Sequence, residues 1–163
     1  MRKIFLSMLC MFLLVNLCSC AEPETSSQST APTALQEIQT ITQEAQAAYE
    51  GNDMVTATNK TNQLMKIAQE PLYTENERLI AKYVAIYINA GMKLNYLIKN
   101  DNAWVNADEN FDSVNGFNIM YGGFFNDVIN GRITHNETLQ EMVGSLVDCT
   151  RPIIERYNQI GGK

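Results

Sequence analysis

Apolar residues recur at spacings of three and four positions from residue 35 to residue 160, and this period constrains the fold more than any other feature of the chain. The pattern is clearest near the C-terminus, where Leu139, Leu146, Ile153 and Ile160 lie seven residues apart. No segment shows the sustained alternation of apolar and polar residues that is typical of a half-buried strand. The sequence therefore predicts an all-α fold, an antiparallel helical bundle of about five helices.

Local helix signals divide this pattern into segments. Two capping boxes, Thr33 with Gln36 and Thr74 with Glu77, mark the starts of two helices. The segment after Thr74 carries apolar residues on more than one face, which predicts the central helix of the bundle. The predicted helices cover residues 33–51, 53–69 and 74–99, two shorter helices between 101 and 130, and one helix from 136 to 160.

Special residues mark the ends and breaks of the later segments. Asp101 is predicted to cap the fourth segment, and Gly116 and the pair Gly122-Gly123 interrupt the helix that follows it. Pro152 lies inside the last segment. Because the apolar phase continues past this proline, we expect one long helix that is kinked there.

A short pattern repeats in the first half of the chain. Ala47-x-Tyr49 recurs 34 residues later as Ala81-x-Tyr83. With Gly51, this stretch loosely resembles a tetratricopeptide repeat, which implies a helical interaction module. The Trp and the Leu-Gly pair of the repeat's first helix are missing, and Tyr49 and Gly51 lie too close together. A bundle is therefore the prediction, and a repeat-like module is the alternative.

Charge and cysteine content exclude several classes of protein. The chain has 12 basic and 18 acidic residues, which gives a formal charge of −6. If Arg2 and Lys3 leave with an N-terminal signal, 10 basic residues remain and the formal charge becomes −8. Such an acidic chain is not a general nucleic-acid binder, which needs a basic surface. With four cysteines, two of them before residue 19, a disulfide scaffold is excluded.

The first 20 residues have the composition of a targeting segment. Arg2 and Lys3 form a positive start, and a mostly apolar stretch follows from Ile4 to Val15. A helix of about 12–14 such residues reaches roughly 20 Å, which is short of a hydrocarbon core of ~30 Å. The stretch therefore predicts the apolar region of a signal peptide and not a membrane-spanning helix.

The residues Leu17-Cys18-Ser19-Cys20 resemble the lipobox of bacterial lipoprotein precursors. The resemblance implies that the signal peptide is removed before Cys20, that Cys20 is acylated, and that the lipid anchors the chain to a membrane. Because Ala21 and not Asp follows Cys20, the sorting rule of such proteins implies the outer membrane, with the protein facing the periplasm. The resemblance covers only this N-terminal stretch, and no family is recognised for the helical body.

The stretch between the lipobox and the first helix is rich in Ser, Thr, Pro and Glu and has no apolar period. It is predicted to be a disordered linker, and its length limits its reach to about 45 Å when fully extended. The predicted organisation is a signal peptide (1–19), a lipidated Cys20 with a flexible linker (20–33), and an α-helical domain (34–163).

The sequence offers few residues for catalysis. His135 is the only histidine. If residues 135–149 form one helix, His135 lies roughly 21 Å from Cys149, too far for a nucleophile–base pair. Cys149 shares the apolar face of the last helix and is predicted to be a core thiol. We therefore expect no enzyme activity and no cofactor.

An oxygen-rich stretch near residue 110 is the only candidate for a cation site. Asp108-x-Asn110-x-Asp112 begins like an EF-hand loop. Ser113 then stands in place of the required Gly, and Ile119 stands in place of the bidentate Glu. The sequence therefore predicts a solvated helix face and no metal site.

Aromatic residues gather between positions 104 and 125. A packed core is the first interpretation of this cluster, but Gly122-Gly123 beside two phenylalanines also permits close approach of a ligand or partner. The candidate ligand or partner face consists of Trp104, Phe111, Phe117, Tyr121, Phe124 and Phe125.

These features favour a lipid-anchored periplasmic helical protein that binds another protein of the envelope without catalysis. An adaptor, an assembly factor and an immunity-type inhibitor all fit that description. A small-molecule or lipid-binding bundle that uses the aromatic face is the first alternative. An envelope enzyme that acts on peptidoglycan is the second, although no catalytic motif supports it.

Overall fold

The computed structural model describes residues 33–161, and the predicted signal peptide and the predicted lipidation site at Cys20 lie outside that range. Within it every regular element is helical, so the predicted all-α bundle is confirmed. The elements are α2 (Ala34–Glu50), α3 (Met54–Ile67), α4 (Glu75–Asn100), α5 (Asn102–Val105), η2 (Asp108–Asn110), α6 (Phe111–Asn115), the π-helical η3 (Gly116–Tyr121), α7 (Gly122–Ile129) and α8 (Asn136–Ile160).

Side-chain caps fix where the first three long helices begin. Thr33 Oγ1 accepts from the backbone N–H of Gln36 at 3.3 Å, and the Gln36 side chain accepts from the backbone of Thr33 at 2.8 Å. Thr74 and Glu77 form the same reciprocal pair at the start of α4. Both predicted capping boxes are confirmed. Asp53 caps α3 by accepting from the backbone N–H of Thr56 at 3.0 Å.

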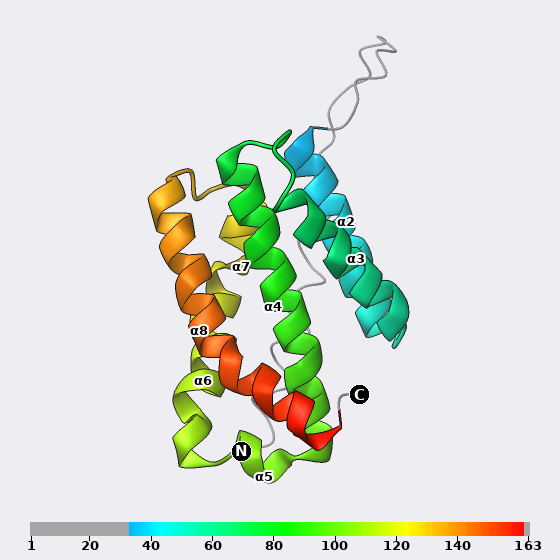
Figure 1. Cartoon of the computed structure of the whole chain (residues 1–163), viewed down its shortest axis with the longest axis vertical. Helices are drawn as coiled ribbons and strands as arrows, with labels where there is room; N and C mark the ends of the chain where they lie inside the picture. Colours follow the sequence, from blue (N-terminus) through cyan, green and yellow to red (C-terminus); the bar gives the residue numbers. More distant parts are fainter. Residues whose placement is uncertain (1–32, 162–163) are drawn as a thin grey trace, which may run out of the picture. The chain divides into compact units, whose positions relative to one another are not determined.

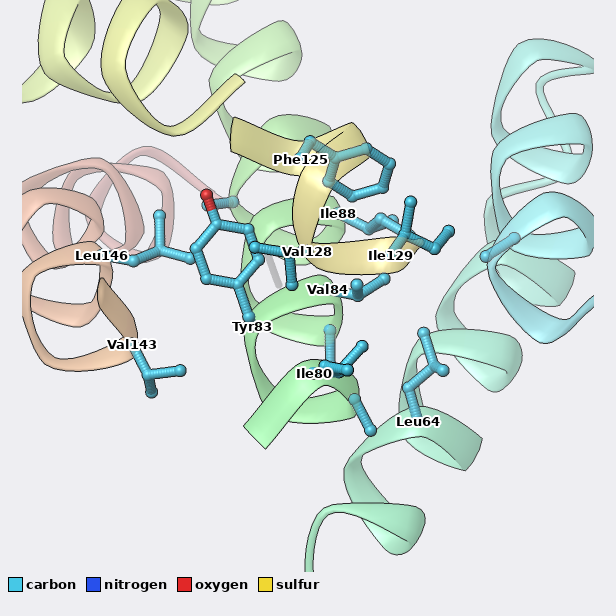
Figure 2. Packing of buried hydrophobic residues seen from close by; sticks show 14 of the residues in the cluster. Leu64, Ile80, Tyr83, Val84, Ile88, Phe125, Val128, Ile129, Val143 and Leu146 are labelled. Carbon is cyan, nitrogen blue, oxygen red and sulfur yellow. The ribbon is translucent and has the colours of Figure 1, made fainter. Parts of the chain in front are cut away.

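Helix α4 is the centre of the bundle, as its apolar faces predict. It packs against α8 on one side and against α3 and α2 on the other (Figure 1). Side chains from α3, α4, α7 and α8 converge on this core, with Tyr83 lying between α4 and Leu146 of α8 (Figure 2). The buried residues of α4 are Ile80, Ala81, Tyr83, Val84, Ala85, Ile88, Ala90, Met92, Leu94 and Leu97.

Helices α4 and α8 run in the same direction, whereas the sequence predicts antiparallel neighbours throughout the bundle. At their N-terminal ends, Asn136 Nδ2 donates to Glu75 Oε2 at 3.1 Å. At their C-terminal ends, Arg156 Nε donates to Asp101 Oδ2. The chain between residues 101 and 135 returns from the end of α4 to the start of α8, and this connection makes the parallel arrangement possible (Figure 1).

Helix α8 is one long helix with Pro152 inside it, as predicted. The side chains of Leu139, Leu146 and Ile153 are fully buried against the bundle. Pro152 has no backbone N–H and its ring displaces the preceding turn, so the helix bends near this point. Figure 1 shows the second half of α8 turning away from the direction of the first half.

The chain between α4 and α8 differs from the two shorter helices that the sequence predicts. It forms short pieces of α-, 3₁₀- and π-helix, and the break lies at Asn106 and Ala107, before the glycines. Gly116 and Gly122 flank a widened π-helical turn and do not end the helix. The predicted side-chain cap by Asp101 is wrong, because α5 has no side-chain cap and the Asp101 carboxylate pairs with Arg156.

The two Ala-x-Tyr patterns occupy different places in the fold. Ala47 and Tyr49 lie at the end of α2, whereas Ala81 and Tyr83 lie in the first third of the much longer α4. The repeated spacing therefore does not mark equivalent positions of two helix pairs.

Candidate functional site

Two of the six candidate aromatic residues belong to the core. Phe117 and Phe125 are 3% and 2% exposed. Phe117 stacks on Tyr87 of α4 with ring centroids 4.8 Å apart, and the tilted Phe125 ring lies 4.9 Å from Tyr87. Burial raises the pKa of the Tyr87 hydroxyl. This aromatic stack attaches η3 and α7 to the central helix and leaves neither phenylalanine at the surface.

The other candidate aromatics lie in different surroundings. Phe111 is 59% exposed and Phe124 is 49% exposed. Trp104 is half-buried and packs at the edge of the core. The side chain of Tyr121 lies outside the described part of the structure. The structure thus divides the five described residues between core and surface, because successive helix positions point about 100° apart.

Gly122 lies close to the Tyr87 hydroxyl. A Cβ atom at this position would lie 3.0 Å from the Tyr87 hydroxyl oxygen, a distance that side-chain carbons rarely adopt. The Tyr87 side chain, which contacts Phe117 and Phe125, would have to shift by a few tenths of an ångström to admit it. Of the two glycines that the sequence suggested for ligand approach, Gly122 packs near Tyr87, whereas a Cβ atom at Gly123 would meet nothing within 4 Å.

Cys149 is a half-buried thiol that holds α8 to the connecting segment. Its Sγ donates to the backbone carbonyl of Ser113 at 3.1 Å. Burial raises the pKa of the Cys149 thiol, and a hydrogen bond from the backbone of Phe117 opposes this in part. His135 is exposed at the start of α8 and makes no side-chain cap. Cys149 is therefore a packing residue, as its apolar helix face predicts.

We expect Cys149 to react slowly with iodoacetamide in the native protein and rapidly after unfolding. The thiolate is the reactive form, and a raised pKa lowers its fraction near pH 8. The raised pKa also contributes stability that is present in full below the thiol's ordinary pKa and is lost as the pH rises through the raised value. Mass spectrometry of the Cys149-containing peptide measures the alkylation rate. Equal rates in native and unfolded protein would contradict the buried position.

Neither a metal cluster nor a membrane-spanning helix occurs in the described range. Among residues 33–161, no group of three or more His, Cys, Asp or Glu side chains is arranged to hold a metal ion. Over the same residues, no helix is both long enough and apolar enough to cross a membrane. Asp108 and Asp112 lie in η2 and α6, where both are exposed.

A groove lies between the first halves of α4 and α8, next to the end of α3. Its volume is about 560 Å³. We call it the α4–α8 groove. Its walls combine apolar side chains with both signs of charge: they consist of Ala68, Glu75, Arg78, Leu79, Lys82, Gln140, Val143, Gly144, Val147 and Asp148.

Arg78 differs from the other arginines of residues 33–161. Arg132, Arg151 and Arg156 each form a salt bridge with an aspartate. Within the same range Arg78 forms no salt bridge, and its Nε is buried without a hydrogen-bond partner. A buried donor on a charged group costs roughly 1–3 kcal/mol or more when it is left unpaired. The fold therefore leaves one N–H of the Arg78 guanidinium without a partner at the wall of the α4–α8 groove.

Neither acidic side chain of the groove forms a salt bridge with Arg78. Glu75 lies one turn before Arg78 but accepts a hydrogen bond from Asn136 at 3.1 Å. Asp148 pairs with Arg151 at 2.6 Å. Lys82, one turn after Arg78, is exposed and belongs to none of the salt bridges found among the described residues. Arg78 and Lys82 thus form a two-cation row along the α4 wall.

Gly144 is not required by the packing of this chain. It lies in the middle of α8, it is exposed, and a Cβ atom there would meet nothing within 4 Å. Glycine in a helix interior is less stable than alanine by about 0.5–1 kcal/mol. The fold therefore tolerates a cost at a position that lines the α4–α8 groove.

We expect Gly144→Ala to raise the free energy of unfolding by about 0.5–1 kcal/mol. Alanine adds helix propensity, and the open space beside Gly144 receives the methyl group without a clash. Chemical denaturation followed by circular dichroism measures the change. A destabilised Gly144→Ala protein would show that the glycine serves the fold itself.

The aromatic residues between 104 and 125 suggested a candidate site that does not include the α4–α8 groove. Two signals were present in the sequence: a glycine inside the otherwise regular period of the last helix, and Arg78 with Lys82 one turn apart on the central helix. Neither signal shows by itself which charges remain unpaired, because the partners come from distant segments.

Comparison with protein-family models, with curated proteins and with solved structures found no match for this chain. No relative therefore supplies a function or a set of site residues. A functional interpretation has to come from the geometry of the described residues and from the N-terminal sequence.

Proposed function

We propose that this protein is a lipid-anchored component of the bacterial envelope that binds another protein without catalysis. The α4–α8 groove is its docking site. One observation carries the proposal: Arg78 lines that groove without a carboxylate partner, while every other arginine of residues 33–161 has one. A partner carboxylate that reaches the terminal N–H groups of the guanidinium would pair this cation.

The N-terminal sequence supports the envelope location. Leu17-Cys18-Ser19-Cys20 resembles a lipobox, and Ala21 favours the outer membrane with the protein facing the periplasm. The stretch between the lipobox and α2 would hold the helical body within about 45 Å of the membrane surface. A tethered protein of this kind acts on partners that are themselves in the envelope.

The alternative of a small-molecule or lipid-binding bundle has less support. It placed the ligand among the aromatics between residues 104 and 125, but Phe117 and Phe125 fill the core against Tyr87. The exposed aromatics Phe111 and Phe124 line neither the α4–α8 groove nor the cavity between α3 and α4. A protein-docking groove between two long helices fits the charges better.

Site-specific photo-crosslinking in living cells tests the proposal. A photoreactive residue replaces Gln140, which lines the α4–α8 groove, or Gln63, an exposed glutamine of α3 that does not line it. We expect a discrete adduct with one envelope protein at position 140 and none at position 63. Equal adducts at both positions, or none at either, would exclude the groove as a docking site.

A further inference from the structure

We propose that the segment docking in the α4–α8 groove is an acidic peptide segment of the partner protein. Its carboxylates pair with Arg78 and Lys82, and an apolar side chain beside them packs on Val147. This inference rests on the proposed function and adds the chemistry of the partner to it.

The arrangement of charge selects a carboxylate. Arg78 and Lys82 are one helical turn apart on α4, so they present two cations in a row to the groove. The guanidinium group binds carboxylates with well-defined hydrogen-bond geometry, and Arg78 has no such partner within residues 33–161. Two carboxylates one turn apart on a partner helix would match this row.

The apolar part of the groove favours a peptide over a free small anion. Val143 and Val147 are one turn apart on α8, and Val147 is 37% exposed. A free phosphate would leave this wall uncovered. A peptide segment that alternates carboxylates with apolar side chains would pair with the cations of α4 and cover the valines of α8.

Gly144 lets the partner come close to α8. It lies between Val143 and Val147 and its missing side chain leaves open space in the groove wall. A side chain at this position would stand where the partner's backbone has to lie. Glycine at position 144 lowers the stability of α8 but leaves room for the partner's backbone.

The net charge of the chain adds specificity. Its formal charge is −6 for the whole sequence, so an acidic segment is repelled by most of the surface. The row formed by Arg78 and Lys82 is then the place where such a segment is held, and it fixes the orientation of docking.

Binding of a defined peptide to the full, detergent-solubilised protein tests the inference. The probe is a fluorescent 14-residue helical peptide with glutamates one turn apart beside leucines, and its counterpart carries glutamine in place of each glutamate. We expect the glutamate peptide to bind at least about ten-fold more tightly. Arg78→Gln and Lys82→Gln should each weaken its binding by about five-fold or more, while inorganic phosphate should not compete with it.

Lys99→Gln is the matched control, because Lys99 is an exposed lysine of α4 that does not line the groove. It should leave the affinity unchanged, and circular dichroism should show all three variants folded. Equal affinity for the two peptides, no saturable binding of the glutamate peptide, or binding insensitive to Arg78 and Lys82 would overturn the inference. Displacement by phosphate would show a phosphate site and would overturn it too.

The two proposals fail in different ways. If position 140 captures a partner through a basic or uncharged segment, the docking function stands and the acidic chemistry is wrong. If position 140 captures no partner, the docking function itself is wrong.

Discussion

Phe125→Ala is expected to lower the free energy of unfolding by about 3–5 kcal/mol, whereas Phe124→Ala should lower it by less than about 1 kcal/mol. Phe125 is 2% exposed and stacks on Tyr87, so its removal leaves a cavity between α7 and α4. Phe124 is 49% exposed and loses little contact when it is shortened. Both substitutions replace a phenylalanine of α7 by alanine, so the change in side-chain size and helix propensity is the same in the two variants.

Urea denaturation followed by circular dichroism measures both variants under the same conditions. A loss of the Tyr87 contact should also appear as a change in the near-ultraviolet signal of Phe125→Ala. Equal stability of the two variants, or a larger loss for Phe124→Ala, would mean that α7 presents the opposite face to the core.

Cys20→Ser is expected to move the protein from the membrane fraction to the soluble fraction. A lipoprotein carries several acyl chains, and each buried methylene contributes about 0.8 kcal/mol to membrane binding. Loss of the proposed acylation site therefore changes partitioning almost completely. Cell fractionation and metabolic labelling with a fatty-acid analogue measure the location and the acylation.

Cys18→Ser is the matched control for this experiment. It changes a cysteine two residues away but keeps Leu17, Ser19 and Cys20, so the lipobox pattern is retained. The control should stay in the membrane fraction and should keep its label. A Cys20→Ser protein that remains membrane-bound would contradict lipid anchoring through Cys20.

Local sequence signals correctly predicted where α2 and α4 begin. Thr33 with Gln36 and Thr74 with Glu77 act within one turn of chain, so their capping boxes can be identified from the sequence alone. The kinked α8 also follows from local features, because the apolar period continues through Pro152. These features depend on interactions between residues close in sequence, so they can be predicted without knowing the fold.

The parallel arrangement of α4 and α8 could not be predicted in the same way. It depends on contacts such as Asp101 with Arg156, which are 55 residues apart. The same contact explains why Asp101 does not cap α5, although its position before a helix suggested that it would. A carboxylate that can cap a helix can also pair with a distant arginine, and the sequence does not show which one occurs.

The unpaired state of Arg78 in the candidate site could not be predicted from the sequence either. Glu75 and Arg78 are three residues apart on one helix, a spacing that favours an ion pair. In the fold Glu75 bonds to Asn136 of α8, and Arg78 is left without a partner among the described residues. The aromatic candidates were identified by sequence density, but a π-helical turn and the 100° step of the helix divide them between core and surface.

The docking role of the α4–α8 groove is tested most directly by Gly144→Leu in the photo-crosslinking experiment at position 140. Leucine is a strong helix former and its Cβ meets open space, so the variant should be at least as stable as the wild type. Its side chain fills the groove, so the adduct at position 140 should fall to the level of the control at position 63. A Gly144→Leu protein that forms the adduct at the wild-type yield would show that the partner does not dock in this groove.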